Sequence, residues 1–506
     1  MKVRRRFIFF LVLVALFFIV APIVILRAKG YQFDFKKGVL VYSGTVTIKS
    51  NPQDFNVFVN GEETASKKLN RINSSYNVGG LRPQSYEISI EAPNFQSWTK
   101  KADVHSGIAT EFWNVLLVRN NYQKTDYDAT GAERFFTSPD NKFIAYSQQA
   151  DDNLNVGIFS LKDIASKKSF SISGYRLMNE ANEENIEWSP EDSTLVSVPA
   201  EKIEPAVPEK KTALSLKAKQ PAKEPAKQYA YFIHNTSDDS TINLNEFLSL
   251  DNIRNVRWDP QEKNYLFFLN KNDLYRVNIE DKKTLLLISD DVSAYDLSGG
   301  FVYFCDSASN LVFRNSLDGK DEKEQITLSF PESNDPVEKM IIYDESRIAL
   351  LTKNKDLVVF NQGEHDDYFK KIGEAVEGMQ FSNDGKKLLF WTNNEISAYF
   401  LRDWNVQPER SEDQLFNITR YSETLKNVQW FNDYEHVIFS IGRFTKIAEL
   451  DYRDRINCLN FPDVSLDNPF VIYNSSLGKL FFTDKKDDSL SLFSIDFPER
   501  TTFLGF

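Results

Sequence analysis

The hydrophobic positions of the chain begin with a single unbroken run. Residues Phe7 to Leu26 are apolar throughout, and about 20 helical residues, each rising about 1.5 Å, span the roughly 30 Å of a bilayer's hydrocarbon core. Lys2 and the arginines at 4–6 precede the run, so the positive-inside rule places the N-terminus in the cytoplasm. We predict that residues 1–29 form a cytoplasmic tip and a signal-anchor transmembrane helix in the cell membrane, with the bulk of the chain extracytoplasmic.

A cleaved signal peptide is the alternative interpretation of this segment. The apolar region of a signal peptide is about 7–15 residues long and ends at a small-x-small cleavage site. Here the run is longer, Arg27 and Lys29 stand where that site would lie, and no cysteine that could carry a lipid follows. Both interpretations export the rest of the protein.

After a linker over residues 30–43, the pattern changes to short alternating runs over residues 44–118. The run from Phe55 to Val59 alternates and stops at Asn60-Gly61, which is the strongest short-range indication of a hairpin. Similar runs occur at 45–48, 86–90 and 111–117. Period-two patterning with such turns predicts a small antiparallel β-sandwich.

Three segments of this region have glycine, proline or tyrosine at particular positions in the predicted strands and turns. They are Gly44 to Pro52, Val57 to Gly61 and Leu81 to Tyr86, although no glycine follows Pro83 and Asn94-Phe95 replaces a Gly-Tyr turn. The pattern resembles the PEGA domain family. The resemblance implies a PEGA-like β-sandwich that serves as a non-catalytic surface or spacer domain.

From about residue 122 onward the chain repeats one unit. In each copy an aromatic residue precedes a polar turn, and a short β run follows the turn. The copies are spaced by about 40–50 residues, which is the length of a four-stranded propeller blade. The leading aromatic residues are Phe136, Trp188, Trp258, Tyr295, Tyr343, Phe381, Trp430 and Tyr473. A lone blade cannot bury both of its faces but a closed ring can, so we predict a β-propeller of seven or eight blades over residues 122–506.

One interval between copies is longer than the rest. Residues 199–228 form a Pro/Ala/Lys/Glu tract, whose composition cannot bury an apolar face. We interpret it as a low-complexity insert within one blade, and removing it restores the period. One interpretation is that its lysines bind an anionic polymer or a membrane surface. We favour the other interpretation, which is a solvated loop.

The repeated turn itself has a known counterpart. Residues Phe381 to Phe390 read Phe-Ser-Asn-Asp-Gly-Lys-Lys-Leu-Leu-Phe. This segment resembles the Ser-Pro-Asp-Gly-Lys-x-Leu-x-Phe unit of TolB-like and WD-like propellers. With the PEGA resemblance it implies a bacterial envelope family and no particular activity. The predicted fold class is mainly β, with an N-terminal transmembrane helix, a small PEGA-like β-sandwich and a seven- or eight-bladed β-propeller.

The amino-acid composition argues against one class of partner and supports the predicted fold class. The net charge of -12 is dispersed along the chain, which keeps a protein soluble and disfavours nucleic acid as a partner. Aromatic residues make up 14% of the chain, and they suit strands. Cys305 and Cys458 are the only cysteines. A disulfide between them stays open in an oxidising compartment, but we favour two buried free thiols.

No catalytic or metal-binding motif stands out in the sequence. The four histidines, His105, His234, His365 and His436, lack ligand-spaced partners. The acidic pairs are Asp151-Asp152, Asp238-Asp239 and Asp366-Asp367. We interpret these pairs as solvated turn residues, because a glycosidase needs two carboxylates about 5–9 Å apart and the sequence does not place them so. We therefore predict no catalytic, cofactor-binding or metal-ligating residues and no cofactor.

The aromatic residues that lead the turns have two interpretations. Phe136, Trp188, Trp258, Phe381 and Trp430 either form a ligand cage or pack between blades, and their fixed position before each turn favours packing.

These inferences predict a non-catalytic, membrane-anchored binding or scaffold protein of the cell envelope. The propeller is the interaction platform, and its partner is another envelope protein or a cell-wall or surface polymer. The alternative is a propeller hydrolase acting on an envelope polysaccharide or peptide, which requires carboxylates or a nucleophile converging at the central channel.

Overall fold

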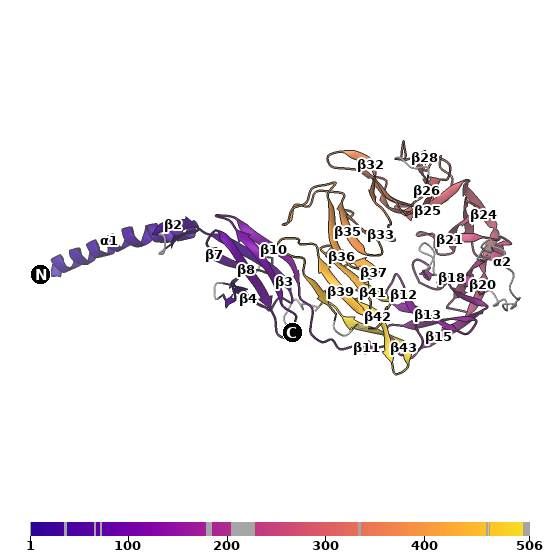
Figure 1. Ribbon diagram of the computed structural model, residues 1–506, viewed down its shortest axis with the longest axis horizontal. Helices are drawn as coiled ribbons and strands as arrows, with labels where there is room; N and C mark the ends of the chain where they lie inside the picture. The colour runs from indigo at the N-terminus through magenta and orange to yellow at the C-terminus, as the bar shows by residue number, and fades with distance from the viewer. Residues whose placement is uncertain are drawn as a thin grey trace, which may run out of the picture.

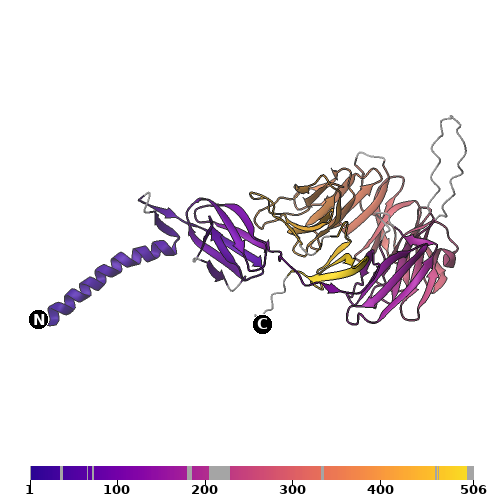
Figure 2. The same cartoon turned by 60° about the horizontal axis from the view of Figure 1, so that its bottom comes forward.

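The computed structural model places a helix, a β-sandwich and a ring of β-sheets in a row (Figure 1). It describes residues 2–34, 38–64, 67–70, 73–178, 185–203, 228–331, 335–461, 464 and 466–498. The tilted view of Figure 2 keeps the sandwich between the helix and the ring. The fold is mainly β, as the hydrophobic pattern predicts.

The N-terminal helix α1 (Lys2–Ala28) contains the apolar run. Its window from Phe7 to Leu26 has a mean hydropathy of 3.3, and none of it is buried. A helix of this length and composition near the N-terminus suits a membrane anchor or a signal sequence. The strands β1 (Tyr31–Asp34) and β2 (Val39–Tyr42) follow and pair as an antiparallel hairpin. The segment assigned to a linker therefore contains regular structure.

The next eight strands form a two-layer sandwich. They are β3 (Gly44–Asn51), β4 (Asn56–Val59), β5 (Glu62–Glu63), β6 (Lys67–Asn70), β7 (Ser75–Leu81), β8 (Gln84–Glu91), β9 (Trp98–Val104) and β10 (Ala109–Leu116). One sheet has the order β10-β3-β7-β6 and the other β5-β4-β8-β9. Alternate residues such as Val46, Ile88 and Phe112 point into a shared core.

One strand pair departs from the expected antiparallel arrangement. Strand β10 runs parallel to β3. The chain reaches β10 by crossing over from β9 in the other sheet, and a crossover, unlike a tight hairpin, allows either strand direction.

The remaining strands form eight sheets in the described part of the chain, which we number as blades 1 to 8. Blade 1 comprises β12 (Arg134–Thr137), β13 (Phe143–Ala150), β14 (Asn153–Ser160) and β15 (Lys167–Ser173), and blade 2 comprises β16 (Tyr175–Leu177), β17 (Glu187–Trp188), β18 (Leu195–Lys202), β19 (Tyr229–Asn235) and β20 (Ser240–Asn243). Blade 3 comprises β21 (Ile253–Trp258), β22 (Tyr265–Asn270), β23 (Asp273–Asn278) and β24 (Asp281–Ser289), and blade 4 comprises β25 (Val292–Ser298), β26 (Phe301–Asp306), β27 (Val312–Ser316) and β28 (Glu324–Gln325). The short helix α2 (Leu244–Leu248) links blades 2 and 3.

Blades 5 to 8 follow the same plan. Blade 5 comprises β29 (Val337–Asp344), β30 (Arg347–Thr352), β31 (Leu357–Gln362) and β32 (Asp367–Gly373), and blade 6 comprises β33 (Gly378–Phe381), β34 (Lys387–Trp391), β35 (Glu395–Phe400) and β36 (Leu415–Arg420). Blade 7 comprises β37 (Leu425–Trp430), β38 (His436–Ile441), β39 (Phe444–Glu449) and β40 (Cys458–Asn460), and blade 8 comprises β41 (Val471–Asn474), β42 (Lys479–Lys486) and β43 (Ser489–Asp496) together with β11 (Thr125–Asp126). Each blade is antiparallel, and blade 2 has a fifth strand because β16 and β17 both pair with β18.

The ring is closed by the two ends of the propeller region. Thr125 pairs with Ser494 and Asp126 with Phe493, so β11 completes the blade that β41 to β43 begin. Because both ends of the propeller region contribute to this one blade, each of the eight blades contains one of the eight repeated turns. The sequence left seven or eight blades open, and the described chain has eight.

The aromatic residues that lead the turns pack between blades. Trp188, Trp258 and Trp430 are 5–6% exposed. Their indole N–H groups donate to the backbone oxygens of Phe136 (3.3 Å), Glu187 (3.2 Å) and Gln380 (3.1 Å) in the preceding blade. Each indole therefore ties one blade to its neighbour, which confirms the packing interpretation for these three residues.

The predicted insert begins inside a strand. Strand β18 runs on to Lys202, because Pro199 pairs with Tyr231 and Ala200 with Ala230. The rest of the insert, residues 204–227, lies outside the described residues.

Candidate functional site

A buried lysine joins the sandwich to blade 7. Lys100 on β9 is fully buried, and its ammonium lies 2.9 Å from Glu449 Oε1 and 3.5 Å from Asp451 Oδ1. It also donates to the backbone oxygens of Asp451, Arg453 (3.0 Å) and Arg455 (2.7 Å). The loop between β39 and β40 in blade 7 therefore surrounds the ammonium group of Lys100, which comes from the sandwich.

Aromatic and amide groups complete this junction. The indole of Trp98 donates to Glu449 Oε2 at 2.8 Å, and the guanidinium of Arg453 lies 4.2 Å from the ring centre of Phe112. Gln407 of blade 6 exchanges two hydrogen bonds with the backbone of β10. Contacts from two blades hold the sandwich in one place.

The charged groups of the junction depend on one another. Removing one partner from a buried ion pair typically costs about 3–5 kcal/mol, because the other charge is left unpaired in a low-dielectric environment. The three N–H donors of Lys100 meet two carboxylates and three carbonyl oxygens. The sandwich and the ring are therefore held in a fixed relative orientation.

The junction uses one face of the ring. In an antiparallel blade, the connections between first and second and between third and fourth strands share one end, and the remaining connections share the other. Loops 401–414 and 450–457, which contact the sandwich, both join a third strand to a fourth. We call this side the junction face and the other side the opposite face, where β18 ends and β19 begins.

A pocket of about 510 Å³ opens on the opposite face between blades 1 and 2. Its lining residues come from the ends of β13, β16 and β18 and the starts of β12 and β14. They are Glu133, Arg134, Ser147, Gln149, Leu154, Arg176, Leu177 and Glu201. Two guanidinium groups and two carboxylates give the pocket a mixed charge.

The charged groups of this pocket are held in place. Arg176 Nη2 lies 2.9 Å from Glu201 Oε1 and Arg176 Nε 3.3 Å from Glu201 Oε2, and this hydrogen-bonded pair raises the pKa of Arg176. Burial raises the pKa of Glu133, and the guanidinium of Arg134 lies 5.3 Å from the ring centre of Phe136. The pocket offers N–H donors and carboxylate acceptors, which suit a polar ligand such as a peptide or a sugar.

A second charged group lies on the first strands of blades 2, 3 and 4. Arg257 Nε is 2.7 Å from Glu187 Oε1, and Arg257 Nη1 is 3.3 Å from Asp296 Oδ1. The Glu187 carboxylate raises the pKa of Arg257, and Asp296 also accepts a hydrogen bond from the backbone N–H of Ile342 at 2.9 Å. These innermost carboxylates pair with an arginine between them, an arrangement that ties three blades together.

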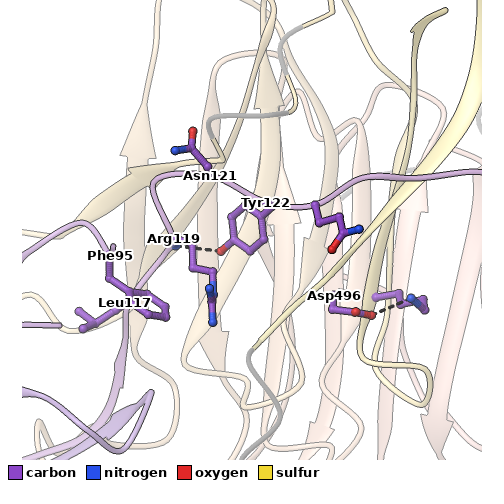
Figure 3. Close-up of a pocket in the computed structure, with 8 residues that line it drawn as sticks. Phe95, Leu117, Arg119, Asn121, Tyr122 and Asp496 are labelled. Carbon is purple, nitrogen blue, oxygen red and sulfur yellow. Dashed lines mark hydrogen bonds and ion pairs between the residues drawn. The ribbon is translucent and has the colours of Figure 1, made fainter. Parts of the chain in front are cut away.

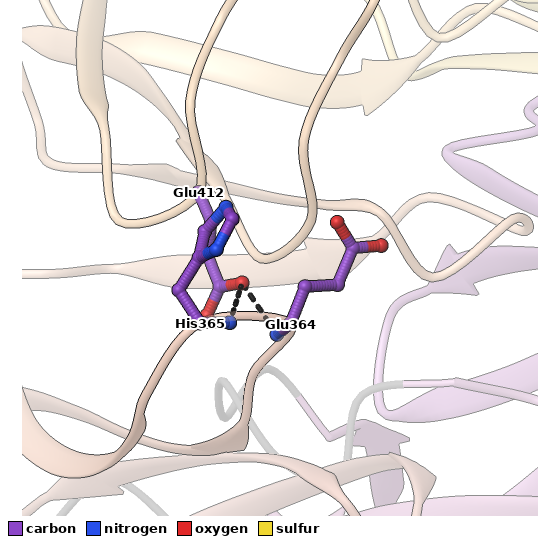
Figure 4. A group of neighbouring side chains, drawn as sticks. All are labelled: Glu364, His365 and Glu412. Atoms are coloured by element: carbon purple, nitrogen blue, oxygen red, sulfur yellow. Dashed lines mark hydrogen bonds between the residues drawn. The ribbon is translucent and has the colours of Figure 1, made fainter.

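Glu364, His365 and Glu412 offer ligand atoms within 4.8 Å of one another (Figure 4). The buried carboxylate of Glu412 accepts hydrogen bonds from the backbone N–H groups of Glu364 (2.6 Å) and His365 (3.3 Å) and from Asn361 Nδ2 (3.2 Å). His365 Nε2 lies 2.9 Å from Asp403, and this pairing raises the pKa of His365. The hydrogen bonds of Glu412 join the Glu364 loop of blade 5 to the Glu412 loop of blade 6, so we interpret the group as a clasp between two loops. The sequence analysis missed it because its members come from different blades.

A pocket of about 440 Å³ lies where the chain leaves the sandwich for blade 8 (Figure 3). The hydroxyl of Tyr122 accepts a hydrogen bond from the backbone N–H of Arg119 at 3.0 Å, and the Arg119 guanidinium lies 5.0 Å from the ring centre of Phe95. Lys479 and Asp496 form an ion pair of 2.6 Å on the propeller side. The pocket therefore lies between residues of the sandwich and of blade 8.

The remaining residues singled out in the sequence lie far apart. The acidic pairs Asp151-Asp152, Asp238-Asp239 and Asp366-Asp367 belong to blades 1, 2 and 5. Cys305 is buried in blade 4 and Cys458 half-buried in blade 7, and both are free thiols, as favoured. Burial raises the pKa of Cys305 to about 12.

Comparisons with known proteins do not name a family. No family model matches the chain, and no curated protein matches it. The PEGA-like and TolB-like resemblances therefore stay predictions.

Among solved structures, the chain is similar to several propellers. The Dos1 propeller is 11% identical, with a TM-score of 0.46 over 74% of this chain and 95% of that one. Kluyveromyces lactis Hsv2 is 9% identical, with a TM-score of 0.39 over 66% and 98%. A putative 6-phosphogluconolactonase from Bacteroides uniformis is 11% identical, with a TM-score of 0.35 over 63% and 94%. At these values they imply nothing about ligand or activity, and the blade assignment rests on strand pairing.

Proposed function

We propose that the protein is a non-catalytic, membrane-anchored binding protein of the cell envelope. The helix α1 anchors it, the sandwich serves as a spacer, and the extracytoplasmic propeller presents loops to another envelope protein or to a cell-wall or surface polymer. Loops on a rigid scaffold are the usual place for recognition.

The buried junction around Lys100 carries this proposal. A flexible tether would leave the ring free to turn, whereas Lys100, Glu449 and Asp451 fix the sandwich against the ring. The fixed arrangement keeps the opposite face and its mixed-charge pocket clear of the loops that hold the sandwich. A platform presented in one orientation suits binding of a large partner near the membrane surface.

The experiment is capture of envelope material by the tagged full chain solubilised from membranes. We expect a co-purifying protein or polymer that is lost with Arg176→Glu, because this change sets a carboxylate against Glu201 in the pocket. Lys320→Glu is the matched control, since Lys320 is 81% exposed in a loop on the junction face. Absence of any specific partner with the unchanged chain would contradict the proposal.

The hydrolase alternative is tested with the same preparation. Incubation with envelope polysaccharide and peptide fractions, followed by mass analysis of the soluble products, is expected to show no release. The innermost carboxylates Glu187 and Asp296 pair with Arg257, and a general acid or base requires a group free to exchange its proton. Product release that disappears with Glu187→Gln would favour the hydrolase.

A further inference from the structure

The hairpin β1–β2 carries one apolar face that stays partly exposed among the described residues. Residues directly opposite each other in an antiparallel pair lie on the same face, and Tyr31 pairs with Tyr42 while Phe33 pairs with Leu40. The exposed fractions of these four side chains are 37%, 38%, 48% and 53% in that order. The rings of Tyr31 and Tyr42 lie against each other with centres 4.8 Å apart and an angle of 36° between their planes.

The hairpin is fixed at the end of α1. The helix ends at Ala28 and β1 begins at Tyr31, so two residues, at most about 7 Å of chain, separate them. Ser43 closes the other side of the hairpin, because its backbone N–H and its hydroxyl donate to the backbone oxygen of Gly30 at 2.8 and 2.7 Å. Figures 1 and 2 show the hairpin between the helix and the sandwich.

Two glycines let Tyr42 pack at this corner. A Cβ built on Gly30 would lie 2.8 Å from the ring of Tyr42, and a Cβ on Gly107 only 2.1 Å from it. Both glycines have positive φ angles, 86° and 71°. Tyr42 therefore links the hairpin to the helix end on one side and to the β9–β10 connection of the sandwich on the other.

The chemistry of the exposed face matches the region where α1 would leave a bilayer. An isolated two-stranded hairpin is marginally stable in water. The polar headgroup layer extends roughly 5–8 Å beyond the hydrocarbon on each side, and tyrosine and other aromatic side chains concentrate there because one end of the ring is apolar and the other polar.

We infer that the face formed by Tyr31, Phe33, Leu40 and Tyr42 inserts into the lipid headgroup region of the membrane that α1 enters. This inference rests on the proposed anchoring of α1. The hairpin supplies a second contact with the bilayer beside the helix, and the two contacts together set the tilt of the sandwich. The orientation is passed on to the ring through Lys100.

The test measures the depth of a nitroxide spin label on the full chain in vesicles of phosphatidylcholine and phosphatidylglycerol. Labels are placed at Phe33→Cys and Leu40→Cys, at Glu87→Cys as an exposed sandwich control, and at Phe17→Cys within α1. Because Cys305 is buried but Cys458 is only half-buried, both are first replaced by serine so that only the introduced thiol is labelled. We expect the ratio of oxygen to nickel-complex accessibility at positions 33 and 40 to exceed that at 87 several-fold.

Each outcome decides a different point. Labels at 33 and 40 that resemble the one at 87, while the label at 17 reports the bilayer interior, would overturn the hairpin inference and leave the anchor intact. Labels at 33 and 40 shielded from both reagents would also overturn it, since a protein partner or a second copy would then cover the face. A water-exposed label at 17 would instead overturn the proposed anchored function. Phe33→Trp with brominated lipids repeats the depth measurement without a label, and quenching beyond that of the unchanged chain is the expected result.

Discussion

The indole N–H of Trp98 donates to Glu449 Oε2 at 2.8 Å, although the two residues are 351 positions apart in the chain. Glu449 uses its other oxygen for the ammonium of Lys100. One carboxylate of blade 7 thus receives a neutral and a charged donor from the same strand of the sandwich. The relative orientation of the two parts depends on this contact.

Lys100→Met is expected to weaken the junction. It leaves Glu449 and Asp451 without their buried cation, at a cost of about 3–5 kcal/mol. The midpoint of denaturant unfolding should fall, and proteases should cleave between sandwich and ring sooner. Lys101→Met is the matched control, because the Lys101 side chain is exposed on the same strand. Adding Glu449→Gln to Lys100→Met should recover part of the lost stability. An absence of recovery would mean that the unpaired Glu449 carboxylate is not the cause of the loss.

Tyr127→Ala is expected to destabilise the closure of the ring. Tyr127 is 3% exposed, and its ring packs against Phe159 of blade 1 and Phe481 of blade 8, with ring centres 5.5 and 5.8 Å away. Truncating a buried aromatic residue costs about 3–5 kcal/mol, which should appear as a lower melting temperature. Leu328→Ala removes an 89% exposed side chain and should change stability by less than about 0.5 kcal/mol. Equal effects of the two changes would argue against a role for Tyr127 in closure.

Trp258→Phe separates packing from hydrogen bonding between blades. The phenyl ring keeps most of the apolar contact but leaves the backbone oxygen of Glu187 without its indole donor. An unsatisfied buried acceptor costs about 1–3 kcal/mol, measured as a shift of the denaturant midpoint. Trp391→Phe, at a half-buried site, serves as the comparison. A neutral Trp258→Phe would show that water replaces the indole.

His436 is expected to make stability depend on pH. Its burial lowers the pKa, but Asp433 at 2.8 Å together with Glu449 and Glu435 outweighs this effect and raises the pKa above its ordinary value. The stabilisation is therefore fully present below the unfolded pKa of about 6.5 and is lost as pH rises through the folded pKa. Unfolding midpoints measured from pH 6 upward should fall in the unchanged protein.

His436→Gln should make this fall shallower, because glutamine does not titrate and the raised pKa of His365 beside Asp403 adds a dependence of its own. His105→Gln, at an exposed loop of the sandwich, should keep the profile of the unchanged protein. A profile that survives His436→Gln would assign the dependence to another group.

The sequence by itself determined the class of fold. The apolar run from Phe7 to Leu26, the period-two strands and the eight aromatic-led turns are local features, and local features fix helices, strands and hairpins through backbone geometry and side-chain alternation. The turns limited the number of blades to seven or eight, and each of the eight described blades has one such turn between its first two strands.

The tertiary structure alone decided how these parts meet. Lys100, Glu449 and Asp451 have nothing in their neighbouring residues that marks them as partners, and the clasp of Glu412 with the Glu364 loop is equally silent in the sequence. Ring closure likewise pairs Thr125 with Ser494. Such contacts arise when packing removes charged groups from water and each must find a partner at hand, and the choice of partner depends on which surfaces the fold brings together.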